Sequence, residues 1–172
     1  CLVGVTNAAT GQAEYKNAMD MDKDFTMLRA TCALPMFFPA IELDGQKYYD
    51  GGIADPIPAK KALEDGCDKL IIVLTQPRGF VKHFGKYDKM GARMLGHRYP
   101  EMKRQIFSRP ERYNETVKYC EQLETEGKAM IIRPNHLLNS FESNVSRLEM
   151  AYWHGYRMTK EKMKKIKKFL TE

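Results

Sequence analysis

The residues best suited to chemistry form a short run, Asp50-Gly51-Gly52, in the first third of the chain. Two glycines let neighbouring backbone approach a carboxylate closely, and their freedom at positive φ can aim it into a cleft. Such an aspartate could act as a general base, bind a metal ion or cap a helix. By itself the run is typical of an ordinary turn, because turns use the same residue types for conformational reasons.

Two further carboxylates, Asp44 and Asp55, lie near Asp50 in the sequence. Together they raise the alternative of a Mg²⁺- or phosphate-dependent enzyme. No other acidic cluster is visible, and the four cysteines and four histidines show no zinc-ligand spacing. No histidine stands beside a candidate nucleophile. We therefore expect neither a metal nor another cofactor.

Turn-forming residues indicate which strands and helices position Asp50. Two short apolar runs within residues 40–49 flank Asp44-Gly45, a strong hairpin signal that leads directly into Asp50. Upstream, the sequence predicts an opening strand over residues 1–6 and a second strand over residues 13–17. A helix should follow, with Asp24 as its N-cap and Pro35 at its end.

Downstream of Asp50, helices and strands alternate, which favours an α/β fold. In chain order we predict first a helix opened by Pro58 and stopped by Gly66, a strand over residues 69–75 and an irregular excursion over about 78–98. Two helices should follow, one from about 100 to 107 and a second stopped by Gly127. A strand over 129–133 and a last helix capped at Ser146 complete the chain. The uninterrupted apolar run of residues 69–75 is typical of a strand covered on both faces, so we expect it inside a sheet.

The longer context of Asp50 is more specific. Residues 30–58 read A-T-C-A-L-P-M-F-F-P-A-I-E-L-D-G-Q-K-Y-Y-D-G-G-I-A-D-P-I-P. This stretch resembles the second signature block of the patatin-like phospholipases, in which a helix ending in Leu-Pro leads through a hairpin to the aspartate of a catalytic Ser–Asp dyad. Residues 5–11 resemble the family's earlier strand and Thr-Gly turn, and four segments between 113 and 149 resemble the C-terminal region of its bacterial branch.

The resemblance implies a fold and a role for each site residue. Asp50 would be the catalytic base, and Gly51 and Gly52 would shape its loop. The fold would be α/β, a three-layer patatin-like sheet flanked by helices, with the N-terminal part of the domain missing. Residues 1–134 would form the C-terminal half of the catalytic domain, and residues 135–172 a C-terminal helical segment.

Departures from the family pattern are equally informative. The nucleophile elbow, G-x-S-x-G, and the glycine-rich oxyanion loop occur nowhere in the 172 residues. Asn7 stands where the family often has an aspartate, and Asp55 where it often has an asparagine. The four serines lie late in the chain, in polar or helix-capping contexts: Ser108, Ser140, Ser143 and Ser146.

From these observations we predict part of a serine lipid acyl hydrolase, an esterase or phospholipase. This chain would supply the base and be inactive alone, and its partners would be a lipid or ester substrate and the missing N-terminal half of the same protein. The alternative is a non-catalytic binding or regulatory module on a truncated patatin-like fold.

Charge is concentrated at the C-terminal end. Residues 157–168 carry seven basic side chains and one acidic, which equals the whole chain's net charge of +6. A uniformly basic nucleic-acid binder would look different. We expect a cytoplasmic protein whose basic C-terminal helix is either a solvated surface or a peripheral contact with a membrane.

Overall fold

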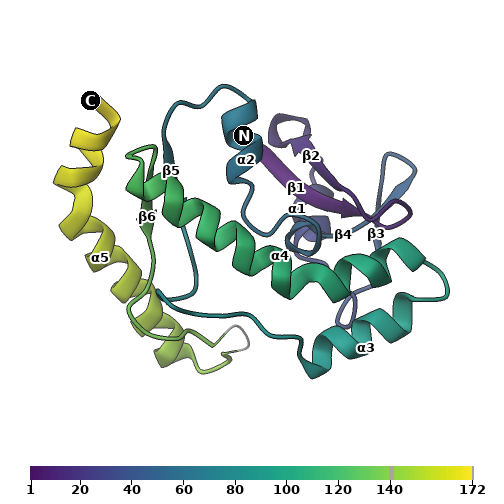
Figure 1. Cartoon of the computed structure of the whole chain (residues 1–172). Helices are drawn as coiled ribbons and strands as arrows, with labels where there is room; N and C mark the ends of the chain where they lie inside the picture. The colour runs from purple at the N-terminus through teal and green to yellow at the C-terminus, as the bar shows by residue number, and fades with distance from the viewer. Residues whose placement is uncertain (140–141, 172) are drawn as a thin grey trace. The chain divides into compact units, whose positions relative to one another are not determined.

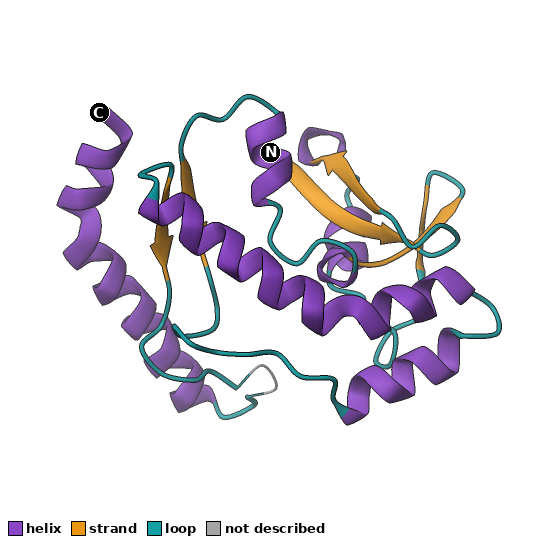
Figure 2. Ribbon diagram, in the orientation of Figure 1, coloured by secondary structure: helices purple, strands orange, loops and turns teal. Residues whose placement is uncertain are grey.

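A computed structural model describes residues 1–139 and 142–171, so Ser140 lies outside the described residues. The chain divides into two compact units. Figures 1 and 2 show its helices and strands. Unit 1 comprises Cys1–Pro58 and Lys82–Val117, and unit 2 comprises Ala59–Val81 and Lys118–Glu172. The mixture of helices and strands is that of an α/β protein, and the three-layer arrangement stays a prediction.

Unit 1 contains a four-stranded antiparallel sheet with the strand order β2-β1-β4-β3. Its strands are β1 (Leu2–Asn7), β2 (Ala13–Asn17), β3 (Ile41–Leu43) and β4 (Gln46–Asp50). The predicted hairpin is confirmed as β3–β4. Asp44 and Gly45 both have positive φ, 53° and 71°, as a two-residue type I′ turn requires.

Short helices flank these strands. They are η1 (Ala18–Asp20), α1 (Thr26–Thr31) and η2 (Gly51–Ile53). The prediction that Asp24 caps the first helix is wrong. Phe25 occupies the cap position in a left-handed conformation, and the Asp22 carboxylate accepts the Thr26 N–H at 2.8 Å instead.

Two longer helices complete unit 1. The stretch predicted as an irregular excursion, residues 78–98, contains the helix α3 (Lys86–Leu95), so that prediction is wrong for half its length. Gly85 opens this helix, and the Asp88 carboxylate accepts the Gly85 N–H at 2.8 Å. The irregular structure was predicted from the glycines and cations of this stretch. In the structure, Ala92 and Leu95 form a buried face of the helix.

The two helices predicted over residues 100–123 are one helix, α4 (Pro100–Thr125), with Pro110 inside it. A proline within a helix costs about 3 kcal/mol. Packing of the helix outweighs that cost, because one face is buried along its length. The buried residues are Met102, Ile106, Pro110, Cys120 and Leu123.

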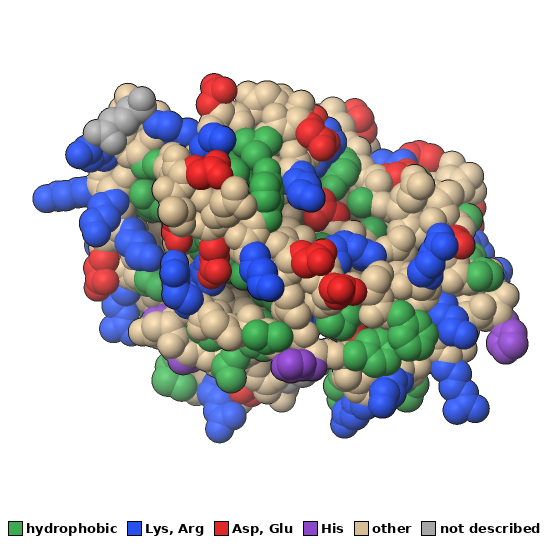
Figure 3. Space-filling view, viewed as in Figure 1, with side chains coloured by type: hydrophobic (Ala, Val, Ile, Leu, Met, Phe, Trp, Pro, Cys, Tyr) green, Lys and Arg blue, Asp and Glu red, His purple; other side chains and the backbone are tan. Residues whose placement is uncertain are grey.

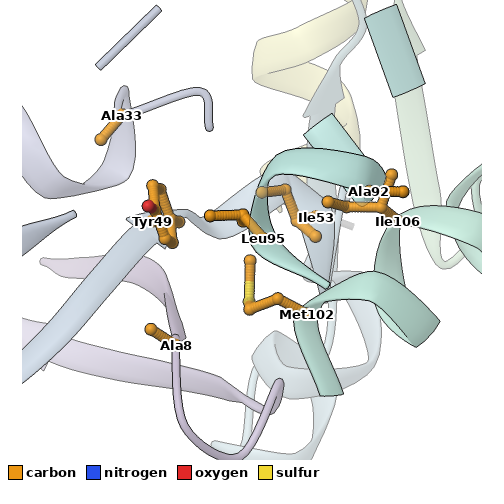
Figure 4. Close-up of a cluster of buried hydrophobic side chains, with 8 residues drawn as sticks. All are labelled: Ala8, Ala33, Tyr49, Ile53, Ala92, Leu95, Met102 and Ile106. Atoms are coloured by element: carbon orange, nitrogen blue, oxygen red, sulfur yellow. The ribbon is translucent and has the colours of Figure 1, made fainter. Parts of the chain in front are cut away.

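The core of unit 1 joins the hairpin to α3 and α4 (Figure 4). Its buried members are Ala8, Ala33, Tyr49, Ile53, Ala92, Leu95, Met102 and Ile106. Tyr49 directly precedes Asp50, and Ile53 follows three residues later. Core packing therefore holds the chain on both sides of Asp50.

Unit 2 contains α2 (Ala59–Glu64), the end of α4, α5 (Val145–Thr171) and a parallel pair of strands, β5 (Leu70–Val73) and β6 (Ala129–Ile132). The prediction that β5 is covered on both faces is wrong. It pairs with β6 in a two-stranded sheet, and Ile71 and Val73 are 38% and 70% exposed. An apolar run shows which residues favour a strand but not which neighbours cover it.

The ends of the unit 2 helices differ slightly from the sequence prediction. α2 begins at Ala59, one residue after Pro58, and Gly66 follows its end with φ at 92°. Ser146 is not the cap of α5. The Asn144 side chain accepts the Arg147 N–H at 3.1 Å, so Asn144 caps the helix.

The type I′ turn gives a stability prediction. Gly45→Ala should destabilise the chain by about 1–2 kcal/mol, because a Cβ is strained at positive φ even though no atom lies within 4 Å of it. Gly155→Ala is the matched control, because Gly155 lies inside α5 with equal space and should become more stable by about 0.5–1 kcal/mol. Urea unfolding measures both, and equal effects of the two substitutions would contradict the turn assignment.

Candidate active site around Asp50

Asp50 is the last residue of β4 and is fixed through its backbone from two sides. Its N–H donates to the carbonyl of Ala33 at 3.0 Å, just after α1. Its carbonyl accepts the hydroxyl of Thr6 at 2.8 Å. Thr6 is fully buried in the neighbouring strand β1, and its hydroxyl also accepts the Ala54 N–H at 3.3 Å. One β1 side chain thus holds both ends of the turn that follows Asp50.

Gly51 and Gly52 both lie where an added Cβ would come close to neighbouring atoms. A Cβ on Gly51 would lie 2.3 Å from the carbonyl oxygen of Gly4, so only glycine fits against β1 there. A Cβ on Gly52 would lie 3.1 Å from Oδ1 of Asp50. Neither glycine has positive φ, so that part of the sequence argument is wrong and the close-approach part is confirmed.

The Asp50 carboxylate caps η2, with Oδ1 accepting the Gly52 N–H at 2.7 Å. Because Oδ1 is occupied in this way, Oδ2 is the oxygen left to accept a proton. Ile53, at the end of η2, is buried in the core. The carboxylate is therefore held by a short, anchored turn.

Two side chains of α4, more than fifty residues away in sequence, contact the turn that follows Asp50. Arg109 Nε donates to the Gly52 carbonyl at 3.1 Å, and its guanidinium lies 3.7 Å from the Asp88 carboxylate. Arg112 donates to the Ile53 carbonyl at 2.7 Å. Both arginines thus hold the Asp50 turn from the helix side. Sequence reasoning missed them, because nothing in the spacing of α4 points to residues 50–53.

Lys82 is a second cation that acts on Asp50, and it is tied to α4 by a pair of hydrogen bonds. The Asn114 side chain accepts the Lys82 N–H at 2.8 Å and donates to the Lys82 carbonyl at 2.9 Å. The ammonium of Lys82 lies 5.6 Å from the centre of the Tyr113 ring. This residue also escaped the sequence prediction, because its stretch reads as irregular.

These surroundings shift the acidities of both groups. Burial raises the pKa of Asp50 above its ordinary value of 3.8, whereas the Gly52 N–H and the charges of Arg109 and Lys82 lower it by less. Burial, together with the charge of Arg109, lowers the pKa of Lys82. A carboxylate with a raised pKa takes up a proton more readily, which suits a general base.

The remaining predicted site residues lie elsewhere in unit 1. Asp44 is exposed in the hairpin turn, at the opposite end of β4 from Asp50. Asp55 accepts a hydrogen bond from the Tyr15 hydroxyl. Asn7 is buried, accepts the Ala9 N–H at 2.9 Å and donates to Glu14 at 2.8 Å. An aspartate at position 7 could not make that donation.

No group of three or more His, Cys, Asp or Glu side chains that could hold a metal ion occurs among the described residues. The metal alternative for Asp50 required Asp44 or Asp55 as a second ligand. Asp44 lies at the far end of a five-residue strand, and Asp55 is engaged by Tyr15.

The close approach at Gly51 predicts that alanine substitution lowers stability more at Gly51 than at Gly4, the glycine that faces it. Gly51→Ala should destabilise the chain by about 1–3 kcal/mol, as overpacking does, because the atom it meets is backbone. Gly4→Ala, on the opposing strand, should be tolerated, since its Cβ would meet only Tyr15 at 3.7 Å. Thermal unfolding of both variants tests this, and the reverse order would contradict the described packing.

The pKa shifts predict opposite pH dependences for two isosteric substitutions. The folded state raises the pKa of Asp50, so its charge costs stability above about pH 3.8. Asp50→Asn should therefore gain stability relative to the parent as the pH rises from 3.8 toward neutrality.

Glu14 is the opposite case. Burial raises its pKa, but hydrogen bonds from Tyr48, Asn7 and Lys16 together lower it below the ordinary 4.5. Its charge thus contributes stability above pH 4.5 that is lost as the pH falls through the folded-state pKa. Glu14→Gln should lose stability relative to the parent as the pH rises through the folded-state pKa of Glu14 to about 4.5, whereas Asp50→Asn gains stability from about pH 3.8 upward. Urea unfolding at several pH values compares them, and slopes of the same sign would refute the assignment.

Comparison with known proteins gives two matches that cover different parts of the chain. Residues 3–63 match the patatin-like phospholipases, and residues 99–171 match a domain of unknown function, DUF6363. The second match begins one residue before α4, so it includes Arg109 and Arg112, which bond to the turn after Asp50, and Asn114, which bonds to Lys82.

A curated relative, the uncharacterized protein YjjU of Escherichia coli (strain K12), is 40% identical over 52 residues. That stretch covers 30% of this chain and 15% of YjjU, so the chain spans a small part of its relative's length. The matched region over residues 3–63 contains β1, the hairpin and Asp50. Residues 3–63 of the chain are therefore similar to the patatin-like phospholipases.

Proposed function

We propose that this chain supplies the general base of a Ser–Asp dyad in a lipid acyl hydrolase, and that Asp50 is that base. The observation that carries the proposal is the state of the Asp50 carboxylate. It is mostly buried at a strand end, fixed by the Gly52 N–H through Oδ1 and free to accept a proton at Oδ2. The match of residues 3–63 to the patatin-like phospholipases supports an ester as the substrate.

The reaction needs one proton acceptor and no histidine. Asp50 removes the proton of a serine hydroxyl while the serine oxygen attacks the ester carbonyl, and backbone N–H groups hold the oxyanion. The departing alcohol then takes the proton from Asp50, leaving an acyl-enzyme. Asp50 next removes a proton from water, which attacks the acyl carbonyl. As the carboxylic acid is released, Asp50 returns that proton to the serine oxygen, and the dyad is regenerated.

The serine must come from polypeptide outside these 172 residues, because no G-x-S-x-G run occurs in them. The same holds for the oxyanion loop. We therefore propose that the 172-residue chain alone does not hydrolyse esters. A binding or regulatory module that keeps Asp50 without a serine is the competing function, and the missing motif is the observation that favours it.

The test uses the full-length polypeptide that contains this sequence and measures hydrolysis of a chromogenic ester and of a phospholipid. Asp50→Asn should lower kcat by at least about 100-fold, the usual effect of losing a general base. Asp55→Asn is the matched control, since it also replaces a carboxylate by an amide of equal size and should keep most activity. The melting temperature of each variant separates loss of chemistry from loss of folding.

Full turnover by Asp50→Asn would remove Asp50 from the reaction. If the full-length polypeptide carries a G-x-S-x-G serine and hydrolyses neither ester, the regulatory module is the better account. Loss of activity in Asp55→Asn to the same extent as in Asp50→Asn would show that the local charge, and not the base, is what matters.

A further inference from the structure

The helix α5 presents an apolar surface that the rest of unit 2 leaves uncovered. Ile166 is the residue of α5 that is buried, and Lys69 holds the helix end through a hydrogen bond to the Phe169 carbonyl at 2.8 Å. Along one side of the helix, large apolar residues recur at helical spacing. They are Val145, Leu148, Tyr152, Tyr156, Met163 and Leu170, each between 41% and 68% exposed. We refer to these six residues as the apolar stripe.

Aromatic side chains are concentrated in the first half of the stripe. Trp153 packs edge-on against Tyr152 and Tyr156, with ring centroids 5.3 and 5.6 Å apart, and is itself 52% exposed. Tryptophan and tyrosine favour the boundary between lipid tails and water, because each combines an apolar ring with a polar group. The cluster thus has the chemistry of a membrane-interface anchor.

The stripe also borders an apolar groove of about 630 Å³ within unit 2. Exposed Val73 of β5 lines its other side, together with Ile132 and Pro134. The apolar surface at α5 is therefore wider than one helix face.

Basic side chains lie directly beside the stripe. Lys160, Lys164 and Lys167 are four and three residues apart, so they share one exposed face that neighbours it around the helix. Residues 157–168 carry a net charge of +6 in all. In the space-filling view, blue side chains gather over α5 (Figure 3).

We propose that α5 binds the surface of an anionic lipid bilayer. The helix would lie in the headgroup plane, with the apolar stripe and Trp153 among the upper acyl chains and the lysines against lipid phosphates. Charge selects this occupant, because a second copy of α5 would bring two strongly cationic faces together. No helix in the described residues is long and apolar enough to cross a membrane, so the contact is with one face of the bilayer.

The proposal is independent of the assignment of Asp50. It needs neither a serine nor turnover, and it concerns unit 2 alone. Membrane binding by α5 and catalysis by Asp50 can therefore each be refuted without the other, because the binding experiment contains no hydrolysis step.

Trp153 supplies a built-in reporter, because it is the single tryptophan of the chain. The chain is mixed with vesicles of phosphatidylglycerol and phosphatidylcholine, and with vesicles of phosphatidylcholine alone. With the anionic vesicles, the Trp153 emission should shift to shorter wavelength, and lipids brominated on their acyl chains should quench it. Both effects should decrease as salt is raised.

Charge-matched variants sharpen the test. The triple variant Lys160→Gln, Lys164→Gln, Lys167→Gln should weaken partitioning into anionic vesicles on the order of 100-fold, the expected effect of three interfacial lysines. The control replaces three exposed lysines outside α5, Lys23→Gln, Lys89→Gln and Lys118→Gln, with the same change in net charge. The control should bind anionic vesicles within a few-fold of the parent.

Several results would overturn the proposal. One is equal binding to neutral and anionic vesicles, and another is equal weakening of binding by both triple variants. A third is a blue shift of the Trp153 emission that occurs without vesicles and increases with protein concentration as a dimer forms. The same holds if the full-length polypeptide fails to bind the vesicles that the 172-residue chain binds, because the stripe would then be covered by protein.

Discussion

The contact between Gly51 and the backbone of β1 is the constraint on which the candidate site depends. A Cβ at position 51 would lie 2.3 Å from the Gly4 carbonyl oxygen, so only glycine at position 51 lets the backbone after Asp50 lie this close to β1. That approach lets the Thr6 hydroxyl bond to the Asp50 carbonyl at 2.8 Å. It also turns the Gly52 N–H back onto the carboxylate at 2.7 Å. Removing the contact would release the strand end that carries the carboxylate.

The site combines the two parts of the chain that match different known domains. Asp50 lies in the stretch matched by the patatin-like phospholipases, and Arg109, Arg112 and Asn114 lie in the stretch matched by the domain of unknown function. The two arginines bind the carbonyls of Gly52 and Ile53, and Asn114 holds Lys82 in place. In this chain, Arg109 and Arg112 thus hold the backbone that follows Asp50.

Local residue chemistry made much of unit 1 predictable. Asp44-Gly45 predicted the hairpin, because a type I′ turn needs residues that tolerate positive φ, and the hairpin in turn placed Asp50 at a strand end. The failures have a common cause in long-range packing. Two helices were predicted where buried Met102 and Ile106 help to sustain the single helix α4. β5 was expected to be covered by neighbours that the apolar run could not specify. Lys82 and the α4 arginines were missed for the same reason.

Titration of the Asp50 carboxyl group shows whether it can be the proton acceptor of an ester hydrolase. Carbon-13 NMR of labelled aspartate, with Asp50→Asn to assign the signal, gives the pKa of this carboxyl in the full-length polypeptide. We expect a pKa above 3.8 that coincides with the acid limb of the kcat/KM profile for ester hydrolysis. An Asp50 that titrates at or below 3.8, or an acid limb that persists unchanged in Asp50→Asn, would contradict it.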